Sequence, residues 1–146
     1  MIALCSRVLS AEVTVAGAAG GRQVVGALDG AGLLVLVGVH RGDGAEQAAT
    51  VVRKVAELRV LAGEESVLTA GAGVLVVSQF TLCGDTSRGR RPSWAAAAPP
   101  AQARVLVEAV VDGLRARGVE VATGRFGADM QVSSVGDGPF TVLVHA

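Results

Sequence analysis

Valine dominates the segments of this chain that have the pattern of β-strands. β-Branched side chains suit the pleated, half-buried surface of a sheet, so the sequence predicts a fold built largely on strands. Strands are predicted over residues 2–8, 12–16, 23–28, 33–39, 74–83, 119–122, 130–135 and 140–145, with a turn over 17–21. The run 33–39 is continuously apolar, which is typical of a central strand buried on both faces.

Two helices are predicted between these strands. The first follows Asp43, whose carboxylate suits an N-cap, and its apolar residues recur at helical spacing. The second begins near Pro99 and Pro100 and stops at Gly118. Because there is no internal repeat and no linker, residues 1–146 are predicted to form one α+β domain.

Composition narrows the classes of function. With 51% hydrophobic and 18% charged residues, the chain can bury a substantial core. Thirteen Lys and Arg residues balance thirteen Asp and Glu residues. The resulting net charge of zero disfavours a polybasic nucleic-acid-binding protein, although a local basic patch stays open. Cys5 and Cys83 cannot form a disulfide framework, so a reduced cytosolic setting is the simpler interpretation.

Neither a secretion signal nor a membrane span is expected. Arg7 and Glu12 interrupt the apolar residues at the N-terminus before the core of a signal peptide develops. The longest uncharged stretch, residues 66–84, contains polar side chains and glycines that suit a buried strand better than a lipid-facing helix. A cytoplasmic protein is therefore expected.

Standard catalytic and cofactor motifs are missing from the sequence. The only histidines are His40, in a glycine-rich turn, and His145, next to the C-terminus. There is no nucleophile elbow, phosphate-binding glycine loop or paired-cysteine motif, and no clustered set of metal ligands. The sequence predicts neither a metal nor another cofactor.

Polar residues interrupt one apolar run. Ser78, Gln79, Phe80 and Thr81 follow Val74–Val77, where an ordinary core strand would stay apolar. By strand alternation Ser78 and Phe80 share one face. One interpretation is an edge strand with one face in water. The other is a strand end that presents backbone N–H groups and a hydroxyl to a ligand.

A second feature is the proline within 137–141. Pro139 cannot donate to a β-ladder, so it is expected at a strand start, an edge or a tight turn. The residues alone favour a plain turn at Gly138 and Pro139 over a cis peptide bond.

A third feature is an arginine-rich loop. Arg88, Arg90 and Arg91 surround a glycine beside hydroxyl groups, which suits phosphate contact, with a simple solvated loop as the alternative. All four aromatic residues lie between residues 80 and 140: Phe80, Trp94, Phe126 and Phe140. They suit either stacking on a base or filling a small core.

Eight motifs, in order along the chain, are together similar to those of one family. They are Arg7–Val8, residues 32–39, 77–82 (Val-Ser-Gln-Phe-Thr-Leu), Asp85–Thr86, 89–93 (Gly-Arg-Arg-Pro-Ser), 98–100, 123–130 (Thr-Gly-Arg-Phe-Gly-Ala-Asp-Met) and 137–139 (Asp-Gly-Pro). On these motifs the chain resembles the D-aminoacyl-tRNA deacylase (D-tyrosyl-tRNA deacylase) family. Each motif alone is weak, but their order is specific.

The resemblance implies an α+β fold with a mostly antiparallel, twisted, barrel-like sheet and two main helices. It also implies a homodimer with the active site at the subunit interface. The site residues implied are Ser78, Gln79, Phe80 and Thr81 for catalysis, and Gly138, Pro139, Arg7, Phe126 and Met130 for substrate binding and chiral selectivity. In this family the Gly-Pro bond is cis and reaches into the partner's pocket, where main chain excludes an L side chain. Arg7 corresponds to a residue that helps to hold this loop.

The implied reaction is hydrolysis of the ester that joins a D-amino acid, or achiral glycine, to the 3′-terminal adenosine of tRNA. An ester is already activated, so backbone N–H groups around Phe80 and Thr81 and a placed water are the expected catalytic parts. Thr81 is expected to position rather than attack, because no base lies at an obvious sequence position beside it. Arg88, Arg90 and Arg91 are the expected phosphate contacts, and neither DNA nor membrane is an expected partner.

Two alternatives stay open. One is an editing domain that removes a wrong L-amino acid, which Gly138 and Pro139 disfavour. The other is a catalytically silent module that binds tRNA ends. An ester-hydrolysis assay separates this silent module from an enzyme.

Overall fold

The computed structural model describes residues 1–17 and 20–146. Its strands are β1 (Ile2–Ala16), β2 (Arg22–Leu28), β3 (Gly32–Gly38), β4 (Gly73–Ser78), β5 (Val121–Thr123) and β6 (Met130–His145). Its helices are α1 (Ala45–Glu57), α2 (Val67–Ala70), α3 (Pro100–Ala116) and the 3-10 helices η1 (Ala62–Glu64) and η2 (Phe80–Cys83). Within these described residues no helix has the length and apolar character needed to cross a membrane. Residues 18–19 of the predicted turn 17–21 lie outside the description.

The sheet is assembled on β1. This strand pairs antiparallel with β2, β3 and β6, whereas β3 with β4 and β4 with β5 are parallel pairs. The strand order is β2-β1-β3-β4-β5, with β6 also on β1. β1 can pair with three strands because its first half pairs with β3 and its second half with β2, while β6 pairs along both halves.

The sheet curls until β2 approaches β5. Gly26 of β2 permits this contact, since a Cβ atom there would lie 2.2 Å from the carbonyl oxygen of Thr123 in β5. A larger residue would force the two strands apart. The α+β class and the barrel-like sheet expected from the resemblance are confirmed.

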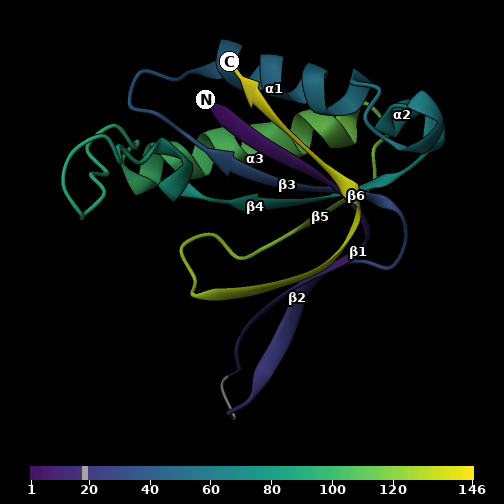
Figure 1. The fold of residues 1–146 in the computed structure, drawn as a ribbon, viewed down its shortest axis with the longest axis horizontal. Helices are drawn as coiled ribbons and strands as arrows, with labels where there is room; N and C mark the ends of the chain where they lie inside the picture. The colour runs from purple at the N-terminus through teal and green to yellow at the C-terminus, as the bar shows by residue number, and fades with distance from the viewer. Residues whose placement is uncertain (18–19) are drawn as a thin grey trace.

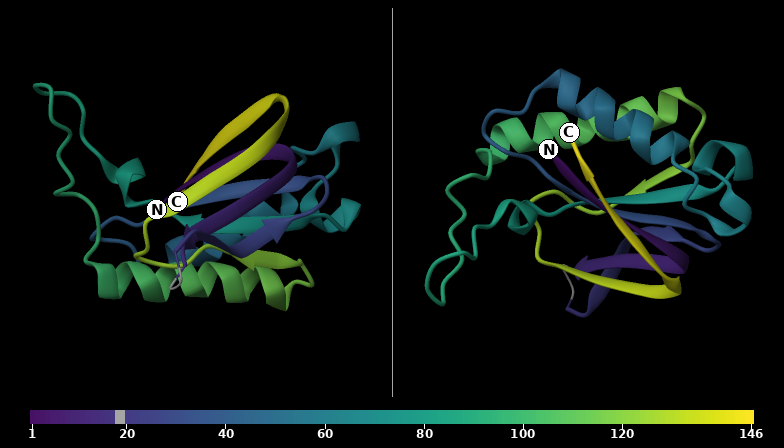
Figure 2. Two further views of the ribbon diagram at one scale, coloured as in Figure 1. Left: turned by 90° about the horizontal axis from the view of Figure 1, so that it is seen from below. Right: turned by 45° about the horizontal axis from the view of Figure 1, so that its top comes forward.

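Two hydrophobic cores lie on opposite faces of this sheet. Helices α1 and α3 lie side by side over one face (Figures 1 and 2) and bury Val55 and Leu114 against Val35 and Val76. The curled interior holds the second core, which contains Val8, Val13, Leu28, Leu34, Leu75 and Val77. Because side chains alternate along β4, its neighbouring residues enter different cores, which explains its continuous apolar run.

β1 and β6 are each one long strand, so the predicted breaks at 8–12 and 135–140 are wrong. β6 accommodates Pro139 in a bulge rather than at a strand start. Ser6 pairs with Thr141 and Val8 with Gly136, so residues 137–140 lie opposite Arg7 alone. Bulge residues leave the ladder, which is why a proline is tolerated inside the strand.

The predicted strand 74–83 is correct only to Ser78. Residues 80–83 form η2, so the predicted sharing of one face by Ser78 and Phe80 is wrong. The edge-strand interpretation fits only the end of β4: Val74–Val76 pair with both β3 and β5, whereas Ser78 pairs with β3 alone in the described sheet. Gly38 explains the change of direction: a Cβ there would lie 2.9 Å from Leu82 Cβ, so only glycine lets η2 cross the end of β3. The last predicted short strand, 119–122, is shifted and lies at Val121–Thr123.

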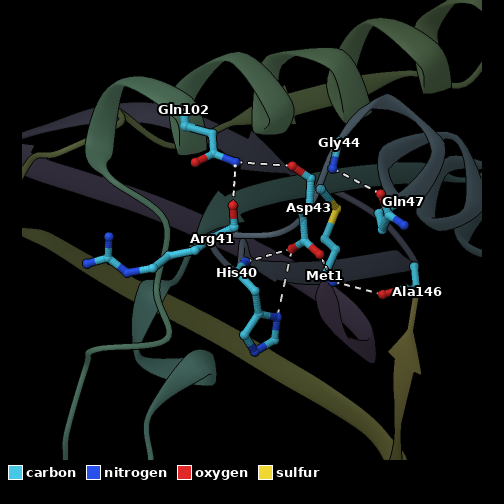
Figure 3. A network of polar contacts seen from close by, with 8 residues as sticks. All are labelled: Met1, His40, Arg41, Asp43, Gly44, Gln47, Gln102 and Ala146. Atoms are coloured by element: carbon cyan, nitrogen blue, oxygen red, sulfur yellow. Dashed lines mark hydrogen bonds and ion pairs between the residues drawn. The ribbon is translucent and has the colours of Figure 1, made fainter.

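Gly44, and not Asp43, is the N-cap of α1. Its N–H donates to Gln47 Oε1 at 2.9 Å. The Asp43 carboxylate instead accepts hydrogen bonds from the Met1 ammonium at 2.7 Å and from the His40 N–H at 2.6 Å (Figure 3). The Asp43 side chain, which the sequence pattern assigned to the helix N-terminus, therefore binds residues outside the helix.

Candidate functional site

A cavity of about 770 Å³ opens where β4 ends. Its walls come from the start of η2, from residues 94–100, from the first turns of α3 and from residues 126–132. The site residues that line it are Ser78, Gln79, Phe80, Phe126 and Met130. Two motifs that are far apart in the sequence thus meet in one cavity, which we call the η2 cavity.

The catalytic segment turns sharply at Gln79. The Gln79 N–H donates to the Val37 carbonyl oxygen at 2.7 Å, which anchors the turn to β3. The Gln79 side-chain amide donates to the Thr81 hydroxyl oxygen. Phe80 and Thr81 open η2, and the first N–H groups of a helix have no partner within it. Thr81 is exposed and lies outside the cavity lining, so the segment offers backbone donors and an oriented hydroxyl at its edge.

Two exposed aromatic rings flank the cavity. The Phe80 and Trp94 rings meet edge to face, with centroids 5.5 Å apart and planes at 75°. Gly84 makes room for the indole, because a Cβ there would lie 2.4 Å from Trp94 Cζ3. Phe80 is 56% exposed and Trp94 41% exposed, so both rings are available to a ligand rather than used in the core.

Another part of the cavity wall carries Phe126 and Met130. The guanidinium of Arg104 in α3 lies over the Phe126 ring, 4.6 Å from its centroid. The Met130 sulfur packs so closely on Gly124 that a Cβ there would lie 2.8 Å away. Packing from α3 and from residue 124 therefore holds both side chains in place.

The Gly-Pro bulge lies elsewhere. Arg7 Nε donates to the Asp137 carbonyl oxygen at 3.1 Å, and the Arg7 guanidinium lies 5.0 Å from the Phe140 ring centroid. The Gly138–Pro139 bond is cis, as the resemblance implies, and the plain-turn interpretation is wrong. None of these bulge residues, nor Arg7, lines the η2 cavity of its own chain.

The arginine-rich loop leads away from the body of the molecule (Figure 2, left). Paired backbone hydrogen bonds of 2.9 Å between Asp85 and Ser93 close its base. Hydrogen bonds from Ser87 lower the pKa of Asp85. Arg88, Arg90 and Arg91 are all exposed, and none forms an ion pair with any residue that the structure describes.

The η2 cavity has no acid–base side chain in its lining: among the described residues, no Asp, Glu, His or Lys lines it. His40 instead lies 3.8 Å from Asp43. Burial raises the pKa of Cys83, and that of Cys5 to about 12, so both thiols stay protonated. Across residues 1–17 and 20–146 there is no group of three or more His, Cys, Asp or Glu residues arranged to hold a metal ion.

Comparison with known proteins gives the family. The model of the D-Tyr-tRNA(Tyr) deacylase family matches residues 4–145. The chain belongs to this family. A D-aminoacyl-tRNA deacylase of Beutenbergia cavernae is 57% identical over 146 residues, which is 100% of both chains.

Solved structures agree with the fold of the D-Tyr-tRNA(Tyr) deacylase family. A c-Myc DNA unwinding element binding protein superposes with a TM-score of 0.89 and 33% identity, over 100% of this chain and 99% of the other. A "probable eukaryotic D-amino acid tRNA deacylase" shares the fold alone, with a TM-score of 0.78, 15% identity and 98% of each chain covered.

The sequence motifs identify several parts of the cavity wall but miss individual residues. Arg41 lines the η2 cavity and anchors its 94–100 wall, with Nε donating to the Ala95 carbonyl oxygen at 2.7 Å. No pattern around Arg41 predicts this contact, because it depends on a distant loop. Arg104 was also missed, although its spacing from Val107 places both on one face of the predicted helix.

Proposed function

We propose that this chain hydrolyses the ester between a D-amino acid and the 3′-terminal adenosine of tRNA. Water adds to the ester carbonyl carbon, the bond to the ribose oxygen breaks, and a proton from the water passes to that oxygen. Free D-amino acid and tRNA leave. Family membership supports the reaction, and the observation that carries it is the η2 cavity, which Ser78, Gln79 and Phe80 line beside the unpaired start of η2.

Catalysis rests on oxyanion stabilisation rather than on a protein base. The N–H groups of Phe80 and Thr81 are the oxyanion donors, and one such donor is typically worth about 10²–10³ in rate. The lining within the described residues contains no carboxylate, imidazole or amine that could activate a nucleophile, which favours a positioning role for Thr81. The 2′-hydroxyl of the substrate ribose helps to activate the water.

Selection for D-amino acids requires a second copy of the chain. Gly138 and Pro139 do not line the η2 cavity of their own chain, so a chiral filter made by them must enter the cavity of a partner. Exposed apolar side chains surround them on β6: Val135 is 54% and Leu143 55% exposed. Apolar exposure of this kind suits a homodimer interface. Main chain at Gly138 would then occupy the space of an L side chain, whereas glycine has none to exclude.

The arginine-rich loop binds the tRNA backbone. The chain has no net charge, so phosphate contact must come from a local group of cations, and Arg88, Arg90 and Arg91 are exposed and free of ion pairs within the described residues. Proofreading of charged tRNA belongs in the cytoplasm, where translation occurs, and neither DNA nor membrane is a partner in this proposal.

The decisive experiment compares D- and L-aminoacyl-tRNA as substrates under identical conditions, with glycyl-tRNA as a third arm. The proposal expects rapid release of the D-amino acid and of glycine, with the L-ester decaying at the rate of the buffer control. Hydrolysis of the L-ester alone would instead identify an editing domain. No hydrolysis, with tRNA still bound, would identify a silent tRNA-end module.

A further inference from the structure

A second cavity, of about 490 Å³, adjoins the η2 cavity. The two share Ser78, Val107 and Phe126, so the Phe126 ring lies on the boundary between them. The second cavity lies between α3 and the end of β5, and we call it the α3–β5 cavity. Two adjoining cavities that share a wall are suited to hold two consecutive units of one polymer.

The charged residues that line the α3–β5 cavity, within the described part of the chain, are three arginines and two carboxylates. Arg115 is already engaged, because it donates to the Val121 carbonyl oxygen at 3.1 Å and lies 3.9 Å from Asp112. Arg104 lies over the Phe126 ring, with no carboxylate partner in the described part of the chain, and Arg125 likewise forms no ion pair there.

The remaining charges favour an anionic ligand. The charges of Arg115 and Asp112 offset each other. The remaining charged lining residues are Arg104, Arg125 and Glu108, so two arginines remain with one carboxylate. Guanidinium groups recognise phosphate through paired N–H donors. Arg104 is further fixed by its contact with Phe126, so little side-chain freedom is lost when it binds a phosphate.

Resting on the proposed function, we infer that the α3–β5 cavity binds the nucleotide that precedes the terminal adenosine of tRNA. The aminoacyl-adenosine occupies the η2 cavity, whose volume lies within the usual range for a small-molecule site, roughly 300–1,000 Å³. The connecting phosphodiester then crosses the Phe126 boundary and meets Arg104 and Arg125. That nucleotide is cytidine in every tRNA, and Glu108 is chemically suited to accept a hydrogen bond from the cytosine amino group.

The test uses two minimal esters, D-aminoacyl-adenosine and the dinucleotide D-aminoacyl-cytidylyl-adenosine, which adds only the phosphodiester and the cytidine. The readout is the ratio of kcat/KM for the dinucleotide to kcat/KM for the adenosine ester. In the wild-type dimer this ratio is expected to exceed one by about tenfold or more, since a charge-assisted hydrogen bond is worth that much.

Arg125→Ala is expected to remove most of this preference, and Arg125→Lys, which keeps the charge, to restore part of it. Arg104→Ala is the second variant. Arg53→Ala is the matched control, because Arg53 is exposed on α1 and lines neither cavity. A wild-type ratio near one, or a ratio that survives in both alanine variants, overturns the inference while leaving the proposed function intact. D-aminoacyl-tRNA is the reference substrate in the same assay: a wild-type protein that leaves it intact overturns the proposed function itself, whereas one that hydrolyses it but neither minimal ester overturns this inference alone.

Discussion

Arg7 Nε lies 2.9 Å from the Asp137 carboxylate, across the bulge that interrupts the pairing of β1 with β6. The same guanidinium covers the Phe140 ring on the far side of the bulge. One side chain of β1 therefore contacts both ends of the segment that carries Gly138 and Pro139. This contact makes the shape of the bulge depend on Arg7.

Replacing Arg7 by alanine is expected to loosen the bulge. The substitution removes a charge-assisted contact that is only partly screened, with Arg7 19% and Asp137 32% exposed, and we expect the free energy of unfolding to fall by about 1–2 kcal/mol. Deacylation of D-aminoacyl-tRNA is expected to fall further than stability. Denaturant titration and initial rates measure the two effects. Arg22→Ala is the control, because Arg22 makes similar hydrogen bonds to Thr14 on β1; equal losses in both variants would contradict a special role for Arg7.

Gly138→Ala is expected to abolish chiral selection while the fold survives. Gly138 has a φ of +139°, and a Cβ there would lie 2.5 Å from the Phe140 nitrogen, so the bulge must change shape. Such backbone strain costs about 1–3 kcal/mol, which corresponds to roughly 5- to 150-fold in rate if it falls on the site. Gly136→Ala is the matched control two residues away, since nothing lies within 4 Å of its Cβ position. The measured quantity is the ratio of D- to L-ester hydrolysis, and an unaltered ratio in Gly138→Ala would refute the assignment.

Thr81→Ala is expected to slow turnover without changing its chemistry. The hydroxyl accepts from the Gln79 amide, so its loss frees Gln79 and disturbs the start of η2. No acyl-enzyme is expected to accumulate in the wild-type protein. Rapid-quench mass spectrometry of wild-type enzyme with excess substrate checks this, and an aminoacyl group trapped on Thr81 would show that it is a nucleophile.

Neutralising Arg88, Arg90 and Arg91 together is expected to flatten the dependence of tRNA affinity on salt. Each lost phosphate contact lowers the slope of log K against log salt by about 0.7–0.9. Filter binding at several salt concentrations measures the slope. An unchanged slope would reassign these residues to structure, and the Arg53→Ala variant is the control for the effect of removing one cation outside the loop.

The two thiols are expected to resist alkylation in the folded protein. Burial raises the pKa of Cys5 to about 12 and also raises that of Cys83, so the reactive thiolate is scarce at pH 8 for both. The reaction should accelerate only as the pH rises well above 8 or as the chain unfolds. Mass spectrometry after iodoacetamide treatment, with and without denaturant, tests this; fast labelling of the native chain at pH 8 would contradict it.

Several features follow from the sequence alone. The apolar run 33–39 predicts a strand buried on both faces, and β3 is such a strand. A solvent-exposed edge strand or loop would not tolerate a continuous apolar run. The stretch after Pro99 predicts α3, whose apolar stripe packs on the sheet. For the polar interruption that begins at Ser78 the sequence left two interpretations open, and the structure places Ser78, Gln79 and Phe80 in the wall of the η2 cavity.

Other features depend on contacts between residues far apart in the chain. Periodicity continues the strand past Ser78, yet η2 forms because Gly38 leaves room for Leu82 above β3. Asp43 carries the pattern of an N-cap, yet the Met1 ammonium takes its carboxylate. The local sequence pattern indicates which secondary structure each segment prefers by itself. Only the tertiary structure decides which preference survives, because a missing Cβ or a buried charge elsewhere in the chain can outweigh the propensity of a few residues.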